Sequence, residues 1–343
     1  MKKYKVGLVG VGRISKNHIA SIEKITNLEL KAVCDVNPTT LSPFKGKVGC
    51  FSNLTDMLKT DLDIVSICTP SGEHAKQAIE ALEAGKNVIC EKPMATSTID
   101  AIAMNEASKK SKGQLFIVKQ NRFNDTVMSV ANLINRGDLG RIYFISSNVF
   151  WTRPREYYTQ APWRGTWAQD GGAFMNQAIH YFDLVQLFGG EVDVVSSFTA
   201  TLEREIEAED TGSAQMRFKS GAIGSVNVTV LTYPKNLEGS ITILAEKGTV
   251  KLSGVAMNEI SHWDVKNVPP PENTNYKTDS VYGFGHERFY YKVIDWIEGQ
   301  KGPITGFDGI KSLQIIESCY KSARENGAPV QLGPLVYLKE QHV

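Results

Sequence analysis

Three polar side chains recur at helical spacing in a largely apolar stretch between residues 173 and 188. Asn176, His180 and Asp183 are spaced at i, i+4 and i+7, so a continuous helix would place them on one face. Buried polar groups need partners, so the three either bond to one another in the core or line a wet cavity. Histidine has an ordinary pKa of about 6.5, which suits proton removal near neutral pH. His180 is therefore a candidate general base, and Asn176 is a second candidate catalytic residue.

A second candidate lies in the segment Cys90-Glu91-Lys92-Pro93, directly after an apolar run that is typical of a strand. A lysine at the carboxyl end of a strand in an α/β sheet faces the edge at which ligands bind. Its ammonium group could there stabilise an alkoxide that forms on a substrate. The alternative is a solvated lysine in a turn, and the spacing alone does not choose between the two.

The chain ahead of His180 is rich in arginine and aromatic residues. Guanidinium groups suit carboxylate or diphosphate oxygens, and aromatic faces suit a base or a sugar. The alternative is that the aromatic rings cap the core while the arginines extend outward. The candidate substrate-binding residues are Lys92, Asn121, Arg122, Arg153, Arg155, Tyr157, Trp163, Arg164, Asn176, Gln177 and His180.

A glycine turn, Gly10-Val11-Gly12-Arg13-Ile14-Ser15, follows the first apolar run and precedes a helical pattern. Gly10 allows the tight turn, and Gly12 lets a diphosphate approach the backbone at the helix N-terminus. Asp35 ends the second apolar run, where a carboxylate can accept hydrogen bonds from ribose hydroxyls and would repel a 2′-phosphate. The pattern predicts a dinucleotide site and favours NAD over NADP. The alternative is an ordinary strand–helix turn followed by a surface aspartate.

The elements that must position these residues follow two different patterns. Apolar runs expected as strands at 5–9, 30–34, 64–68, 87–90 and 115–119 alternate with helical patterns near 14–25, 53–59, 74–84 and 97–111. This alternation predicts a parallel sheet that is covered on both faces. Runs of period two follow at 141–150, 193–203, 211–218, 223–231, 239–246 and 249–252, with helices expected at 125–136, 173–188, 285–298 and 308–326.

The predicted fold class is α/β. An N-terminal doubly wound Rossmann sheet, residues 1–121, would bind NAD. A C-terminal α+β domain with a large, open, mainly antiparallel sheet, residues 122–343, would bind substrate and oligomerise.

Composition excludes several classes of function. Lys and Arg total 38 against 37 Asp and Glu, which argues against a general nucleic-acid or anionic-membrane binder. The chain has no run of about 18 apolar residues, so no membrane span is expected. The lysines at the start precede a glycine-interrupted run that favours a first strand over a signal peptide. The five scattered cysteines are typical of buried thiols in a reducing cytoplasm. No metal is expected.

Four motifs together resemble the glucose–fructose oxidoreductase / inositol dehydrogenase (Gfo/Idh/MocA) family over essentially the whole chain. They are Gly10-x-Gly12-x-x-Ser15, Thr69-Pro70-Ser71-x-x-His74, Ala84-Gly85-Lys86-x-Val88 with Glu91-Lys92-Pro93, and the helical His180. The resemblance implies that Lys92 and His180 flank a sugar carbon that gives up hydride, and that the Thr-Pro turn lies beside the nicotinamide. The cofactor-binding residues expected from the turn, from Asp35 and from the resemblance are Gly10, Gly12, Arg13, Ile14, Asp35, Thr69, Pro70, His74, Glu91, Lys92 and Gln120.

Within that family, the arginine-rich loop and Gln120-Asn121-Arg122-Phe123-Asn124 are similar to one branch, which oxidises the C3 hydroxyl of UDP-N-acetyl-2-amino-2-deoxy-D-glucuronate. The similarity implies a UDP-sugar substrate, a role in making bacterial surface polysaccharide (O-antigen) sugars, and a homo-oligomer, either a tetramer or a dimer. Asn176 replaces an Asp found in many members, which leaves the division of labour between Lys92 and His180 open. The alternatives are a dehydrogenase of a free polyol such as inositol, or a nicotinamide-sensing regulator.

Overall fold

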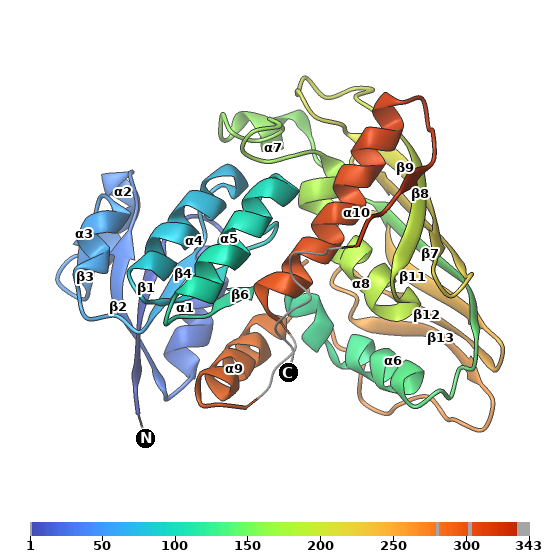
Figure 1. The fold of residues 1–343 in the computed structure, drawn as a ribbon, viewed down its shortest axis with the longest axis horizontal. Coiled ribbons are helices and arrows are strands. Elements are labelled where there is room, and N and C mark those ends of the chain that lie inside the picture. The colour runs from blue at the N-terminus through green and yellow to red at the C-terminus, as the bar shows by residue number, and fades with distance from the viewer. Residues whose placement is uncertain (1, 279–280, 301–303, 335–343) are drawn as a thin grey trace. The chain divides into compact units, whose positions relative to one another are not determined.

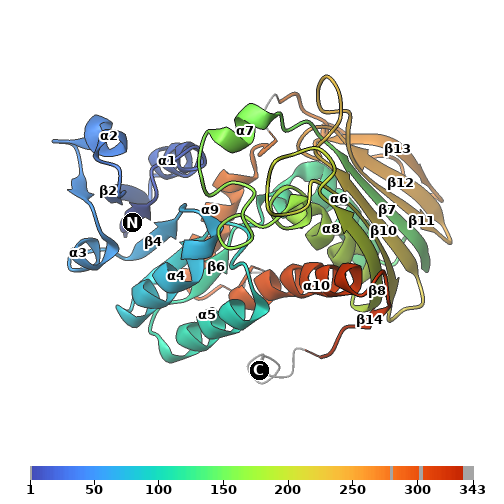
Figure 2. The same ribbon diagram turned by 90° about the horizontal axis from the view of Figure 1, so that it is seen from above.

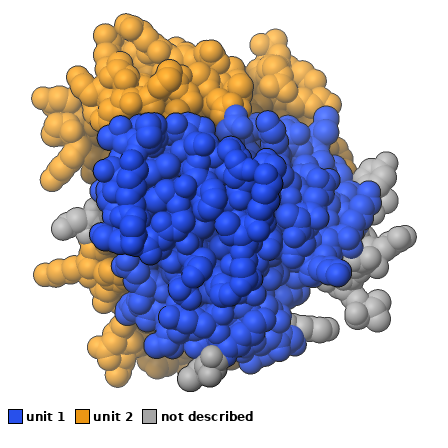
Figure 3. Space-filling model, turned by 90° about the vertical axis from the view of Figure 1, so that its left-hand side faces the viewer, with its two compact units in different colours: residues 1–119, 286–310 blue, residues 120–285, 311–343 orange. Residues whose placement is uncertain are grey.

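The structure is a computed structural model that describes residues 2–278, 281–300 and 304–334. The chain divides into two compact units, which Figure 3 distinguishes by colour. The first unit contains residues up to 119 together with residues 286–310, and the second contains residues 120–285 and those from 311 onward. A cofactor-binding domain at 1–121 and a substrate-binding domain at 122–343 remain a prediction about function. The segment 286–310 belongs to the first compact unit, although it follows the second unit's residues in the sequence.

The first unit is built on a six-stranded parallel sheet (Figure 1). The strands run in the order β3 (Gly49–Phe51), β2 (Leu28–Cys34), β1 (Tyr4–Val9), β4 (Ile64–Ile67), β5 (Asn87–Cys90) and β6 (Leu115–Ile117). The central strands β1, β4 and β5 are almost wholly buried, as continuous apolar runs require in a sheet with helices on both faces. The strand order is that of a doubly wound dinucleotide-binding fold, so the prediction for this half is confirmed.

The helices of the first unit alternate with its strands along the chain. They are α1 (Ser15–Lys24), α2 (Pro38–Leu41), α3 (Leu54–Leu58), α4 (His74–Glu83), α5 (Thr98–Lys110) and, from the C-terminal part of the chain, α9 (Gly285–Ile297). Asn53 and Ser97 accept hydrogen bonds from the backbone N–H groups of Asp56 and Asp100 and so start α3 and α5. Trp296 of α9 makes an edge-to-face contact with Phe116 of β6.

The second unit contains a mainly antiparallel sheet of eight strands (Figure 2). Their order is β13 (Glu259–Val265), β12 (Gly248–Ser253), β11 (Glu238–Ala245), β7 (Ile142–Phe150), β10 (Ile223–Thr229), β9 (Thr211–Phe218), β8 (Val192–Ala200) and β14 (Val330–Gln331). Only the β7–β10 pair is parallel among the described strand pairs of this sheet. Helices α6 (Asp125–Asn135), α8 (Ile179–Gly189) and α10 (Gly306–Arg324) complete the described long helices, and α8 packs on β7 and β10.

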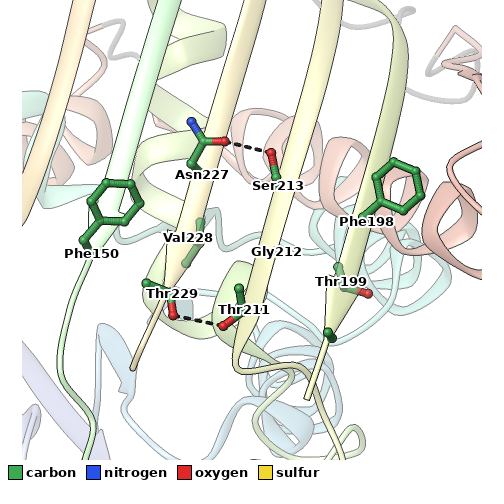
Figure 4. Close-up of a pocket in the computed structure, with 10 residues that line it drawn as sticks. Phe150, Phe198, Thr199, Thr211, Gly212, Ser213, Asn227, Val228 and Thr229 are labelled. Atoms are coloured by element: carbon green, nitrogen blue, oxygen red, sulfur yellow. Dashed lines mark hydrogen bonds between the residues drawn. The ribbon is translucent and has the colours of Figure 1, made fainter. Parts of the chain in front are cut away.

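The opposite face of this sheet is open. Residues on β9 alternate between buried and exposed, as a half-solvated strand requires. Figure 4 shows polar residues of β9 and β10 paired across this face, with Ser213 bonded to Asn227 and Thr211 to Thr229. Exposed apolar side chains on the same sheet are Phe198, Ile223 and Leu244. The predicted open sheet is therefore confirmed.

Three short or marginal strands were not predicted, namely β3, β13 and β14. They lie at the edges of the two sheets, and most of the β13 side chains are exposed, so that strand has little of the apolar alternation that reveals a strand. Among the described residues, no helix combines the length and the hydropathy needed to span a lipid bilayer.

Candidate active site

The glycine turn after β1 has the backbone geometry that a diphosphate needs. Gly10 has a φ of +85°, and a Cβ there would come within 2.7–2.8 Å of the backbone of Cys68 and Thr69. A Cβ at Gly12 would meet nothing within 4 Å, so this point of the turn is open. Ile14 precedes α1 without any side-chain cap, and the first turn holds no acidic residue, so its backbone N–H groups suit an anion. These residues fit the diphosphate of NAD.

Asp35 lies beside the turn, at the end of β2. Its Oδ2 accepts a hydrogen bond of 2.7 Å from the backbone N–H of Val11, and its Oδ1 accepts one of 2.8 Å from that of Asn37. The half-buried carboxylate is thus fixed in orientation. Each oxygen retains lone-pair capacity for a ribose hydroxyl, since a carboxylate oxygen accepts about two hydrogen bonds.

Replacing Asp35 with Ser is expected to raise the KM for NAD by about tenfold and to raise the kcat/KM for NADP relative to NAD. Hydrogen bonds to a charged group contribute about 1.5–3 kcal/mol, and the substitution also removes the charge that repels a 2′-phosphate. Initial rates with each cofactor measure both effects. Glu29→Ser, at the opposite end of β2, is the matched control. An unchanged preference in Asp35→Ser would contradict the role of Asp35.

The predicted Thr-Pro turn and Lys92 are linked by His74 at the start of α4. The ring of His74 lies 2.9 Å from the Thr69 carbonyl oxygen through Nε2, and 2.7 Å from the Pro93 carbonyl oxygen through Nδ1. His74 is buried, and burial lowers its pKa. Both partners accept, so a neutral ring donates to only one of them. His74 therefore holds the ends of β4 and β5 together, and the half-buried Lys92 lies on that edge.

In the second unit, the helix predicted over 173–188 is not continuous. Residues Ala173–Gln177 form a π-helical turn, and α8 begins only at Ile179, so Asn176 does not share one regular helical face with His180. The expected i, i+4, i+7 stripe was wrong on this point, because the periodicity assumed a single α-helix. Single π-helical turns occur frequently at functional sites.

The three polar residues of this segment each bond to a different part of the chain. The Asn176 amide donates to Asp170, whose other oxygen accepts a hydrogen bond of 2.7 Å from the Gly165 N–H. Asp183 forms a bidentate ion pair with Arg122, and both N–O distances are 2.7 Å. Asn176 and Asp183 therefore each have a partner elsewhere in the second unit.

His180 is buried and lies 3.1 Å from the side-chain amide nitrogen of Gln120, measured from Nε2. An amide nitrogen only donates, so in this arrangement the Nε2 atom accepts and carries the lone pair that a general base needs. Asn121, next to Gln120, has a buried side-chain oxygen without a hydrogen-bond partner in the structure. The turn that contains Gln120, Asn121 and Arg122 thus contacts α8 through Gln120 and Arg122.

The arginine-rich loop contains one compact cluster. Arg153 donates to the Gln177 side chain at 2.9 Å, and Gln177 lies 3.3 Å from the Tyr157 hydroxyl. The guanidinium of Arg164 lies over the Tyr157 ring at 4.1 Å and over Trp163 at 5.5 Å. The buried Nε of Arg164 has no hydrogen-bond partner in the structure. Two cations, an amide and aromatic faces therefore lie together.

Arg155 is separate from this cluster. It pairs with Glu203 at 2.9 Å and with Glu205 at 3.5 Å, and all three side chains are largely exposed. The structure thus brings Arg153, Tyr157, Trp163, Arg164 and Gln177 together and places Arg155 with the acidic residues of the loop after β8.

Glu209 is a buried carboxyl group that the sequence did not single out. Its Oε1 accepts hydrogen bonds from the Phe174 N–H at 2.8 Å and from the Tyr320 hydroxyl at 2.9 Å, while its Oε2 has no partner in the structure. A Cβ at Gly172 would overlap this carboxyl group. Burial raises the pKa of Glu209 to about 7, against the lowering effect of its two hydrogen bonds. Glu209 therefore supports the π-helical turn that carries Asn176.

Glu209 makes the stability of the second unit depend on pH. Because its pKa rises from 4.5 to about 7 on folding, the folded state holds the proton more tightly, and the added stability is present below pH 4.5 and lost as the pH rises through 7. The full effect is about 3 kcal/mol at about 1.4 kcal/mol per pKa unit. We expect the fall in Tm between pH 5 and pH 8 to be smaller by roughly 5 °C in Glu209→Gln than in the wild type. Glu205→Gln, an exposed neighbour, should behave as wild type, and equal pH dependence in Glu209→Gln would contradict the prediction.

Comparisons with known proteins agree with this geometry. The family model "Oxidoreductase family, NAD-binding Rossmann fold" matches residues 4–119, and "Oxidoreductase family, C-terminal alpha/beta domain" matches residues 131–332. The crystal structure of the WlbA dehydrogenase from Bordetella pertussis in complex with NADH and UDP-GlcNAcA is 49% identical, with a TM-score of 0.92, over 97% of this chain and 98% of that chain.

The WlbA structure from Chromobacterium violaceum, also with NADH and UDP-GlcNAcA, is 48% identical, with a TM-score of 0.89, over 97% of each chain. Myo-inositol 2-dehydrogenase from Thermotoga maritima is 27% identical over 94% of this chain and 96% of its own length. The family match confirms the predicted NAD cofactor, and the chain belongs to this oxidoreductase family, with its NAD-binding Rossmann domain followed by its C-terminal alpha/beta domain.

Proposed function

We propose that this protein uses NAD to oxidise the C3 hydroxyl of UDP-N-acetyl-2-amino-2-deoxy-D-glucuronate to the 3-keto sugar nucleotide. The observation that carries the proposal is the 49% identity, over nearly the whole of both chains, to a WlbA dehydrogenase in complex with NADH and UDP-GlcNAcA. Similarity to polyol dehydrogenases is much lower, at 27% for the Thermotoga maritima relative. This difference favours a sugar nucleotide over free inositol.

His180 is proposed as the general base. Its Nε2 atom accepts a hydrogen bond from Gln120, which keeps the lone pair on the atom that would take the hydroxyl proton. When substrate binds, the sugar hydroxyl replaces the Gln120 amide as the donor to Nε2, and the proton passes to the imidazole. NAD, when bound, supplies the acceptor for the hydride that leaves C3. Asn176 orients the turn ahead of α8 through its bond to Asp170.

Lys92 is proposed to stabilise the negative charge that develops on the C3 oxygen as the proton leaves. An ammonium group on a half-buried residue can act in this role because the protein excludes part of the water that would screen its charge. The Arg153, Tyr157, Arg164 and Gln177 cluster is proposed to hold the uronate carboxylate or the diphosphate. The unpartnered Arg164 Nε supports this role, since a buried donor requires an acceptor.

We further propose that the protein acts in the cytoplasm, in the synthesis of bacterial surface polysaccharide sugars such as those of O-antigen. A homo-oligomer, a tetramer or a dimer, is proposed to form through the open face of the eight-stranded sheet. The exposed Phe198, Ile223 and Leu244 support this proposal, because apolar side chains on an open sheet gain stability when a partner covers them.

The proposed activity is tested by following NADH absorbance with purified protein, NAD and either UDP-GlcNAcA or myo-inositol. We expect NADH formation with the sugar nucleotide and a 3-keto product by mass spectrometry. Turnover of inositol alone would overturn the substrate assignment. NAD binding without turnover of any sugar would instead support a nicotinamide-sensing regulator.

A further inference from the structure

A network of buried polar side chains lies at the carboxyl edge of the first unit's sheet, and the proposed reaction uses none of them directly. His18 of α1 lies 2.9 Å from Glu91 through Nε2, and 2.8 Å from the Tyr290 hydroxyl through Nδ1. His286 lies 3.4 Å from the same Glu91 oxygen. The Tyr290 hydroxyl donates to Ser66 at 3.1 Å. All five side chains are buried.

Two segments far apart in the sequence meet in this network. His286 and Tyr290 lie at i and i+4 on α9, so they share one face of that helix. Through them, α9 reaches the ends of β4 and β5 and a side chain of α1. The helix is therefore attached to the sheet at the edge where Lys92 lies, and not only through apolar packing.

Charge in the network is concentrated on one pair. Burial acts to raise the pKa of Glu91, but the hydrogen bonds from His18 and His286 outweigh it and hold that pKa well below its ordinary value. Burial acts to lower the pKa of His18, but its polar neighbours Cys68, Tyr290 and Glu91 raise it well above the ordinary value. A buried ion pair of this kind is weak evidence for added stability, because both charges lose their water. A role in placing other groups accounts better for its presence.

Glu91 connects the network to Lys92. One carboxylate oxygen accepts from the two histidines, while the other accepts a hydrogen bond of 3.1 Å from the backbone N–H of Lys92. The side chain of Glu91 is thus held at both oxygens. A shift of the histidines would move Glu91, and with it the peptide from which the Lys92 side chain extends.

A metal ion is the competing occupant of this cluster. The donor atoms of His18, Glu91 and His286 all lie within 4.8 Å of one another. However, the 2.9 Å separation of His18 Nε2 from Glu91 Oε1 matches a hydrogen bond between the residues themselves, and His286 Nε2 makes a longer one of 3.4 Å to the same oxygen. The second nitrogen of His18 and the second oxygen of Glu91 also have protein partners. The contacts therefore favour a hydrogen-bond network.

We propose that His18, His286 and Tyr290 are positioning residues that act on Lys92 through Glu91. The inference rests on the proposed function only in so far as Lys92 contacts the substrate. It adds that a helix from the C-terminal part of the chain, α9, controls the position of a group at the end of β5.

The test compares adjacent tyrosines and graded histidine variants. Tyr290→Phe removes the hydroxyl that bonds to His18 and Ser66, whereas Tyr291→Phe removes a hydroxyl from a largely exposed side chain on the same helix. We expect Tyr290→Phe and His286→Leu to lower kcat per NADH-binding site by about tenfold, with the Kd for NADH changed less than about twofold. Tyr291→Phe should match wild type, and His286→Gln, which keeps a donor near the Nε2 position, should recover most of the loss.

A purely structural role would lower Tm and the number of NADH-binding sites while leaving kcat per site unchanged, and that result would overturn the inference. Loss of wild-type activity on chelation, with recovery on adding Zn²⁺, would overturn it in favour of a metal centre. A measurement that needs no turnover tests this inference independently of the proposed function. After a pulse of acetic anhydride, mass spectrometry should show at least about a twofold change of acetylation at Lys92 relative to Lys31 in Tyr290→Phe. An unchanged ratio of Lys92 to Lys31 acetylation would contradict the inference even if the protein has the proposed activity.

Discussion

Replacing His180 with Ala should lower kcat for the sugar nucleotide by about a thousandfold while leaving the Kd for NADH near that of the wild type. General base catalysis by a positioned side chain contributes about 10²–10⁴ in rate, and alanine leaves no group to take the hydroxyl proton. The proposed NAD contacts Gly12 and Asp35 belong to the first unit, and this change leaves them in place. Initial rates and NADH titration measure the two effects.

The control for this variant is His262→Ala, because His262 is an exposed histidine in the same unit. A second variant, Gln120→Leu, removes the amide that donates to His180 and should lower kcat by a smaller factor, about tenfold, by releasing the ring. Wild-type turnover by His180→Ala would remove His180 as the base. The proton would then have to pass to another group.

Replacing Lys92 with Ala is expected to lower kcat by about a hundredfold or more. Removing one group that stabilises a developing oxyanion costs about 10²–10³ in kcat when the site excludes water. Lys92→Arg keeps the charge but not the compact shape of the ammonium group, so it should recover only part of the rate. Steady-state kinetics with saturating NAD measures each variant.

Lys76→Ala is the matched control, because Lys76 is exposed on the neighbouring helix α4. If Lys92→Ala turns over like wild type, Lys92 has no role in the chemistry, and a role limited to cofactor contact remains. If neither the wild type nor the variant turns over but both bind NADH, the sensor alternative gains support.

The sequence was sufficient to predict those features whose sequence pattern lies within a short segment. The strand–helix alternation of the first 120 residues was predicted from periodicity, and the positions of the Gly10 and Gly12 turn and of Asp35 from a short motif; the structure has the sheet order, the turn and Asp35 at these places. Helix starts at Asn53 and Ser97 were also readable, because a cap acts over three residues. For such features the physical cause and the sequence pattern are separated by only a few positions.

The sequence was insufficient where partners are distant. Arg122 and Asp183 are 61 residues apart, and nothing in either neighbourhood indicates that they pair. The π-helical turn at Ala173–Gln177 breaks a pattern that fits a continuous helix, and Glu209 beneath it is one carboxylate in an acidic loop. His286 is the clearest case, because its partner Glu91 lies 195 positions earlier. A periodicity argument has no access to such contacts.

The return of residues 286–310 to the first unit has a consequence for protein engineering. The first compact unit is encoded in two separated stretches, so a fragment that ends near residue 121 would expose the surfaces of His18 and Phe116 that α9 covers. Chimaeras that exchange cofactor preference between relatives would therefore need to transplant both stretches together. Limited proteolysis in the connecting loops should likewise release no stable N-terminal piece.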